Sequence, residues 1–212
     1  WAHATGQLHE QGRMHNDIMK FPGDTFYEEQ LFVLPGNARQ LLHYHERFQQ
    51  AVQHEFLAKH RMIFIPVDGK ETFELAKNSP NESKVVISLV SEIEKMYEVN
   101  GLAFKTDTIG IITPFRAQIA QIRRDMIQSQ MDPEKYTIDT VERLQGGARE
   151  IIIYSSVVNS YKRMQQIVSN ETGGLDRKLN VAVTRAREQF ILVGNKTILS
   201  ENELYKKLIE NL

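Results

Sequence analysis

The 212-residue sequence contains no cysteine, which excludes disulfide scaffolds and thiolate metal sites. The lack of cysteine also favours a reducing compartment, so we expect an intracellular, cytoplasmic location. No apolar run approaches the roughly 18 residues that a membrane span needs. The first five residues, WAHAT, lack the basic and then apolar pattern of a signal peptide. The sequence therefore predicts no membrane contact.

An excess of charge of either sign is also missing. The chain has 26 basic and 27 acidic side chains, for a net charge of −1. This balance excludes a strongly basic coat for nucleic acid, so any contact with nucleic acid must be local. The chain begins without methionine inside a polar segment, and we expect a piece of a longer protein.

A phosphate-binding loop of the form GxxxxGK[ST] is absent as well. The only Gly-Lys pair is Gly69-Lys70, which Glu71 follows and which has no glycine at the required upstream position. The chain therefore cannot hold a nucleotide alone in the manner of P-loop proteins.

From residue 62 onward, short β-rich runs alternate with helical patterns, which is typical of an α/β fold with a parallel sheet sandwiched between helices. Several of the runs are apolar on both faces, as buried parallel strands are. The predicted strands are Met62 to Asp68, Thr108 to Thr113, Tyr136 to Val141, Ile151 to Val158 and Phe190 to Gly194.

Helical periodicity predicts the connections between these strands. One helix starts at Ser79 or Asn81 and another runs from about Phe115 to Gln130. A third helix places Leu175, Leu179, Ala182 and Ala186 on one side. A last helix closes the chain from Glu201 to Leu212. We expect Val158 to Gly174 to be a long loop. The polar stretch from Leu41 to His60 is predicted to be a helical extension.

Two candidate sites follow predicted strands, where open α/β sheets bind their ligands. Thr113, Pro114 and Arg116 surround the start of a helix, which favours a clasp for backbone phosphates. An ordinary strand-to-helix turn capped by Thr113 explains the same residues. After the next strand, paired glycines in Glu142 to Glu150 allow backbone to approach an anion. A solvated glycine turn is the alternative for that segment.

Arg185 stands near the carboxyl end of the predicted helix that holds Leu179 and Ala182. A permanently charged guanidinium on a rigid helix suits the charge that builds on a transferring phosphoryl group. A favourable interaction with the helix dipole is the simpler alternative. No periodicity explains the earlier segment Gln11 to His15.

No metal site is predicted. His43 and His45 are two residues apart, which puts them on different faces of a helix, and no carboxylate accompanies them. Asp139, Glu142 and Glu150 could be read as a nuclease metal site, but the resemblance described next accounts for them.

Taken in order, these segments resemble the C-terminal motor domain of superfamily 1B helicases of the senataxin-like group. Gln11 to His15 resembles motif IV, commonly QYRMH, and Asn81-Glu82 at the start of a helix, followed by Ile109 to Phe115, resembles the stretch N–E … IGVITPY. Thr140 to Glu150 resembles motif V, and Leu179 to Arg187 matches motif VI, LNVALTRAR, almost letter for letter. Only residues 37 to 61 and the C-terminal helix lack a motif.

The resemblance implies a RecA-like domain, a P-loop NTPase fold lacking its own P-loop, over residues 62–212. Residues 1–61 would hold motif IV and the helical extension. ATP and Mg²⁺ would be bound mainly by the N-terminal RecA-like domain of the same protein, which is one expected partner. The other expected partner is single-stranded DNA or RNA.

The resemblance also assigns roles to residues. Arg13 and Arg185 would reach the γ-phosphate as catalytic arginine fingers. The remaining nucleotide-binding positions would be Gln11, Glu142, Gln145, Gly146 and Arg187. Those on the nucleic-acid track would be Thr113, Pro114, Arg116 and Thr140.

Two departures from the family pattern stand out. Gly12 occupies the place of a tyrosine that stacks on adenine, so base recognition comes from elsewhere or is weak. Ala148 replaces a motif V glutamate, which removes a carboxylate from that loop. A non-catalytic RecA-like module that binds single strands or a protein is the alternative function. An unrelated flavodoxin-type domain would explain the strands but not the ordered motifs.

Overall fold

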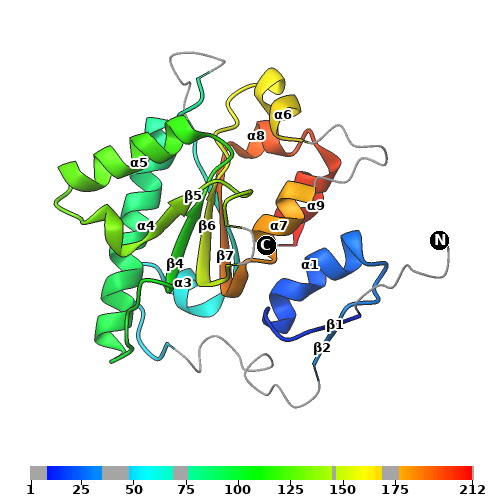
Figure 1. Cartoon of the computed structure of the whole chain (residues 1–212), viewed down its shortest axis with the longest axis horizontal. Helices are drawn as coiled ribbons and strands as arrows, with labels where there is room; N and C mark the ends of the chain where they lie inside the picture. The colour runs from blue at the N-terminus through cyan, green and yellow to red at the C-terminus, as the bar shows by residue number, and fades with distance from the viewer. Residues whose placement is uncertain (1–8, 35–47, 69–75, 145–146, 169–176, 212) are drawn as a thin grey trace.

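The computed structural model describes residues 9–34, 48–68, 76–144, 147–168 and 177–211. Its main sheet has five strands in the order β3-β7-β6-β4-β5, and every neighbouring pair is parallel. The strands are β3 (Met62–Pro66), β4 (Ile109–Ile112), β5 (Thr137–Asp139), β6 (Arg149–Ser155) and β7 (Ala186–Gly194). All five predicted strands are confirmed, with shifts of a few residues at their ends. Figure 1 shows the sheet between two layers of helices.

Side chains alternate between the two faces of the sheet, and both faces are apolar. Ile151 and Ile153 of β6 pack on one side, whereas Ile152 and Tyr154 pack on the other. All four are essentially inaccessible to solvent. This burial on both faces explains why the strand sequences are continuous apolar runs, and it confirms the predicted α/β sandwich.

One face is covered by α3 (Glu55–Lys59), α4 (Pro80–Val99) and α5 (Arg116–Gln128). The opposite face is covered by five helices that contribute to a second apolar cluster. These are α1 (Asn16–Phe26), α6 (Tyr161–Ile167), α7 (Arg177–Val183), α8 (Lys196–Leu199) and α9 (Glu203–Glu210). A short 3₁₀ helix, η2 (Pro133–Lys135), precedes β5. No described helix is long and apolar enough to cross a membrane.

The N-terminal segment forms elements that periodicity did not predict. β1 (Glu10–Gln11) pairs in parallel with β2 (Phe32–Val33), and α1 lies between them. Met14 and Ile18 belong to the same buried cluster as Phe190 of β7. This segment therefore packs directly on the sheet, and the proposed division into residues 1–61 and 62–212 stays a prediction.

The prediction of a helix from Leu41 to His60 is wrong for residues 48–54 and confirmed for α3. Residues 35–47 lie outside the described residues. Residues 48–54 form no helix, and only residues 55–59, which make up α3, are helical. Side chains of α4 and of its C-cap supply the reason. Asn100 accepts hydrogen bonds from the backbone of Gln49 and Gln50, and Glu92 accepts from Gln53 and His54. These bonds replace the ones a helix would form.

Two further predictions need correction. The helix that was expected to include Ala186 ends at Val183, because Ala186 pairs with Arg149 at the start of β7. The stretch from Val158 to Gly174 contains α6, which Ser160 caps by accepting from the N–H of Arg163. Residues 169–176 lie outside the described residues.

Candidate functional site

Most of the predicted site residues that the structure describes fall at two opposite edges of the sheet. Arg185 directly precedes β7, so it lies at the edge where the parallel strands begin. Thr113 and Thr140 directly follow β4 and β5, so they lie at the edge where strands end. At about 3.3 Å per residue, the strand register separates the two edges by about 20 Å. In Figure 1 the amino edge faces β1 and β2, and the carboxyl edge faces α6 and α8.

Two arginines meet at the amino edge. Arg13 donates from Nη1 to the carbonyl of Thr184 over 3.3 Å, and Arg185 donates from Nη1 to the carbonyl of Gly147 over 3.4 Å. Burial, and then the positive charge of Arg13, lower the pKa of Arg185, while Tyr27 raises it. Arg185 lies in the turn between α7 and β7 rather than on the helix, which corrects the prediction.

Neither guanidinium is neutralised by a carboxylate within the described ranges. The Nε atom of Arg185 is buried and has no hydrogen-bond partner there. Two like charges that are held close together without a counter-ion are costly, and an anion would relieve that cost. The pair therefore fits a phosphate group, and the exposed side chain of Arg13 leaves the site open to solvent.

The neighbouring predicted residues make internal contacts. Gln11 accepts from the backbone N–H of Arg13 over 2.9 Å and of Met14 over 2.7 Å, and donates to the carbonyl of Met14. Its side chain therefore shapes the loop that carries Arg13. Arg187 pairs with Asp107 at 3.7 Å.

Glu142 lies at the far end of α7 from Arg185. Its carboxylate pairs with Lys178, the second residue of that helix, at 3.0 Å. Partial burial alone would raise the pKa of Glu142. Hydrogen bonds from its own backbone, from Lys178 and from Thr140 outweigh burial and hold the pKa below its usual value. Gln145 and Gly146 lie outside the described residues.

At the carboxyl edge, Thr113 and Thr140 lie side by side. The N–H of Thr113 donates to the carbonyl of Asp139, which immediately precedes Thr140, over 3.2 Å. The side chain of Thr113 is fully buried and its Oγ1 has no partner among the described residues, so a phosphate contact would require it to become accessible. Arg116 is exposed in the first turn of α5, beside half-buried Pro114.

A buried carboxylate that the motif analysis did not single out for function also organises the carboxyl edge. Glu82, only 3% exposed, accepts from the hydroxyl of Ser155 at 2.7 Å and from the N–H of Val157 at 3.0 Å. Val157 has a φ of +55°, a left-handed backbone that a β-branched residue rarely adopts. Glu82 therefore holds the end of β6 in a strained turn. Helical pattern alone hides this role, because the residue occupies an ordinary first-turn position.

An aromatic and cationic pair lies at the same edge. The guanidinium carbon of Arg163 lies 4.8 Å from the centre of the Phe115 ring. Burial lowers the pKa of Arg163. The pair connects α6 to the residue that precedes α5, and periodicity could not predict it because α6 lies in the expected loop.

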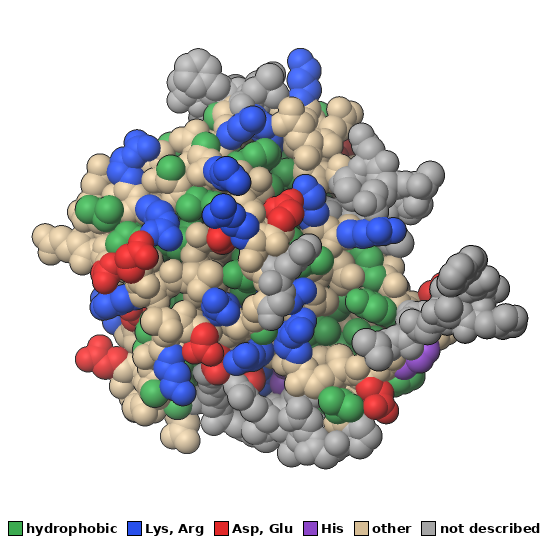
Figure 2. Space-filling view, in the orientation of Figure 1, with side chains coloured by type: hydrophobic (Ala, Val, Ile, Leu, Met, Phe, Trp, Pro, Cys, Tyr) green, Lys and Arg blue, Asp and Glu red, His purple; other side chains and the backbone are tan. Residues whose placement is uncertain are grey.

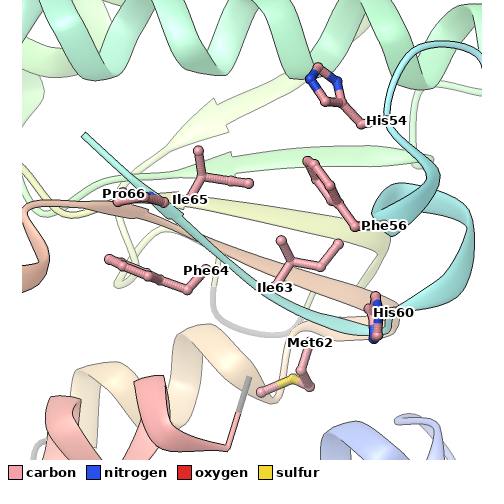
Figure 3. A pocket seen from close by; sticks show the side chains of 8 residues that line it. All are labelled: His54, Phe56, His60, Met62, Ile63, Phe64, Ile65 and Pro66. Carbon is pink, nitrogen blue, oxygen red and sulfur yellow. The ribbon is translucent and has the colours of Figure 1, made fainter. Parts of the chain in front are cut away.

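Neither the charged side chains on the visible face nor the hollow along β3 indicates a further functional site. Figure 2 shows basic side chains spread over the visible face with acidic ones among them. An apolar hollow of about 460 Å³ lies along β3, the edge strand. Figure 3 shows Ile63 and Ile65 pointing to the same side as His54 and Phe56, and Phe64 to the other. None of its lining residues is a predicted site residue.

The structure does not bring the acidic trio together as a metal centre. Asp139 accepts from the N–H of Thr140, Glu142 pairs with Lys178, and Glu150 accepts from Tyr97. In the described part of the chain, no group of three or more histidine, aspartate or glutamate side chains could hold a metal ion. His43 and His45 lie outside it.

Comparison with known proteins decides the family. A family model described as an AAA domain matches residues 2–197. The chain belongs to this AAA domain family. Relatives of this AAA domain include the helicase sen1 of Schizosaccharomyces pombe, 30% identical over 95% of the chain. An uncharacterised ATP-dependent helicase of Methanocaldococcus jannaschii is 29% identical over 96%. The AAA domain spans 11% and 28% of these two relatives. The resemblance to superfamily 1 helicases is thereby confirmed.

A solved structure also aligns with this AAA domain. The C-terminal domain of a possible DNA helicase from Lactobacillus plantarum aligns with a TM-score of 0.47 and 11% identity, covering 87% of this chain and 88% of that one.

Proposed function

We propose that this AAA domain is the second motor half of an ATP-dependent helicase or translocase. In this proposal it supplies Arg13 and Arg185 to the γ-phosphate of ATP that a companion RecA-like domain binds. One observation carries the proposal: two guanidiniums that have no acidic partner among the described residues lie together at one edge of the sheet. Such groups stabilise the charge that develops during phosphoryl transfer.

The geometry supports a division of labour within the proposed motor. The amino edge would face the nucleotide, and the carboxyl edge would hold a single strand of DNA or RNA. Exposed Arg116 at the start of α5 and the helix N–H groups beside it suit backbone phosphates. Closing and opening of the cleft between the two motor domains would then couple hydrolysis to movement along the strand.

The sequence has no P-loop, so nucleotide and Mg²⁺ would be held chiefly by the companion domain. Mg²⁺ would supply charge neutralisation at the phosphates when bound. Arg13 and Arg185 would bind the terminal phosphate from the opposite side and orient it. ATP and nucleic acid are intracellular, and we propose that location for the motor.

The test is a steady-state ATPase assay of the full-length protein with single-stranded DNA or RNA at fixed salt. Arg185→Ala and Arg13→Ala should each lower kcat by about 1,000-fold, because arginine fingers contribute that much to phosphoryl transfer. The matched control is Arg123→Ala, which removes an arginine from an exposed ion pair on α5 and should leave kcat unchanged. Near-wild-type turnover in both variants would reject the proposal and favour a non-catalytic binding module.

A further inference from the structure

A partly buried ion cluster joins the elements that follow the two arginines in the chain. Arg61, only 5% exposed, donates from Nη1 to the carboxylate of Glu188 over 2.6 Å and to the carbonyl of Glu188 over 3.1 Å. Its Nε lies 3.7 Å from the carboxylate of Asp17. Arg61 therefore bridges β7 and the first turn of α1.

Each of the two elements that Arg61 joins follows closely after one of the proposed fingers in the chain. Asp17 is four residues after Arg13, and Glu188 is three residues after Arg185. The backbone adds one direct tie, because the N–H of His15 donates to the carbonyl of Arg187 over 2.8 Å. His15 also begins α1 by accepting from the N–H of Asp17. The spacing between the two fingers is therefore set by the way α1 sits on β7.

We infer that Arg61 is a positioning residue that sets the spacing of Arg13 and Arg185, acting through Glu188 on β7 and through Asp17 on α1. This inference rests on the function proposed above. The hydrogen bonds from the Arg61 guanidinium to Glu188 have fixed directions, and the ion pair with Asp17 holds α1 beside them, which a hydrophobic contact cannot reproduce. Where a buried ion pair has a defined role, it contributes more to holding one geometry than to net stability.

The physical consequence is a loss of rate rather than of binding. Fingers that are misplaced by about 1 Å still attract the triphosphate, but they no longer meet the charge of the transition state, which costs about 100-fold. Substitution in this cluster should therefore lower kcat and leave KM for ATP nearly unchanged. A merely structural cluster would lower the thermal midpoint and leave the kcat of the folded protein intact.

The experiment uses the full-length protein and two substitutions. Arg61→Met keeps the length of the side chain and removes its charge, and it should lower kcat about 100-fold. Asp17→Asn removes the ion pair between Arg61 and α1 and leaves the bonds of Arg61 to Glu188 in place, although it also weakens the local pairs of Asp17 with His15 and Lys20. Because the side chain of Asp17 is 45% exposed, this variant folds even where Arg61→Met does not. It should lower kcat about tenfold with an unchanged thermal midpoint. The control is Asp24→Asn, an exposed carboxylate on the same helix, with wild-type kcat expected.

Combining Asp17→Asn with Arg13→Ala separates the outcomes. If Arg61 acts through the fingers, Asp17→Asn has less than about a twofold effect once Arg13 is absent, because interacting residues are non-additive. The same factor in both backgrounds would overturn the inference, and so would a wild-type kcat for Asp17→Asn. If Arg13→Ala and Arg185→Ala both keep near-wild-type turnover, the proposed function fails instead.

Discussion

At the scale of single residues, the proposed site differs from the scaffold because its arginines have no acidic partner among the described residues. Arg61 and Arg185 are both partly or wholly buried arginines, but Arg61 pairs with Glu188 while Arg185 faces Arg13 and backbone carbonyls. Sequence could indicate Arg185, because motif VI surrounds it. Nothing in the sequence could indicate Arg61, because its partners are 44 and 127 residues away along the chain. Long-range pairs of this kind need the fold.

Glu82 gives a second residue-scale prediction. Glu82→Gln replaces an acceptor oxygen with a donor NH₂ group that faces the N–H of Val157 and the hydroxyl of Ser155. The buried mismatch should lower the free energy of unfolding by about 2 kcal/mol. Denaturant unfolding followed by circular dichroism measures it. Glu98→Gln, an exposed change on the same helix, serves as the control, and equal stability of the two variants would contradict this account of Glu82.

At the scale of elements, short β-rich runs that alternate with helical patterns predicted all five strands, and several of these runs are apolar on both faces, as buried parallel strands are. Helix ends were less predictable. Pairing with Arg149 drew Ala186 into β7, and the side chains of Glu92 and Asn100 drew residues 49–54 away from a helix. Both outcomes depend on tertiary partners that compete with local periodicity. The turn that carries Arg185 is one result.

The close approach of β6 and β7 gives an element-scale prediction. A Cβ added at Gly194 would lie 2.2 Å from Oγ of Ser156 and 2.9 Å from a methyl group of Leu199. Gly194→Ala should therefore lower the free energy of unfolding by about 1–3 kcal/mol. Gly23→Ala, inside α1, is the control, since the atom nearest to its added Cβ is Cβ of Leu31, 4.0 Å away. Alanine there should raise the free energy of unfolding by about 0.5–1 kcal/mol. Thermal unfolding of both variants and of the wild type tests this prediction. A Gly194→Ala variant as stable as the wild type would refute the steric argument.

At the scale of the whole molecule, the site residues divide between two edges of one sheet. The rule that ligands bind beyond the carboxyl ends of strands predicts the edge of Thr113 and Thr140, but not the edge of Arg185. A motor half explains the second edge, because its arginines would serve a nucleotide held by another domain. The order of motifs in the sequence indicated the group, while the side-by-side packing of Arg13 and Arg185 needed α1 to dock on β7.

The most direct measurement compares two ligands in the full-length protein. Wild type and Arg185→Ala are titrated with ADP alone and with ADP, Mg²⁺ and aluminium fluoride, a mimic of the transferring phosphoryl group, in the presence of a single strand. The account predicts an affinity loss of about 100-fold or more for the mimic and less than about threefold for ADP, because the guanidinium binds charge that only the transition state carries. Equal affinity of the two proteins for the mimic would contradict it.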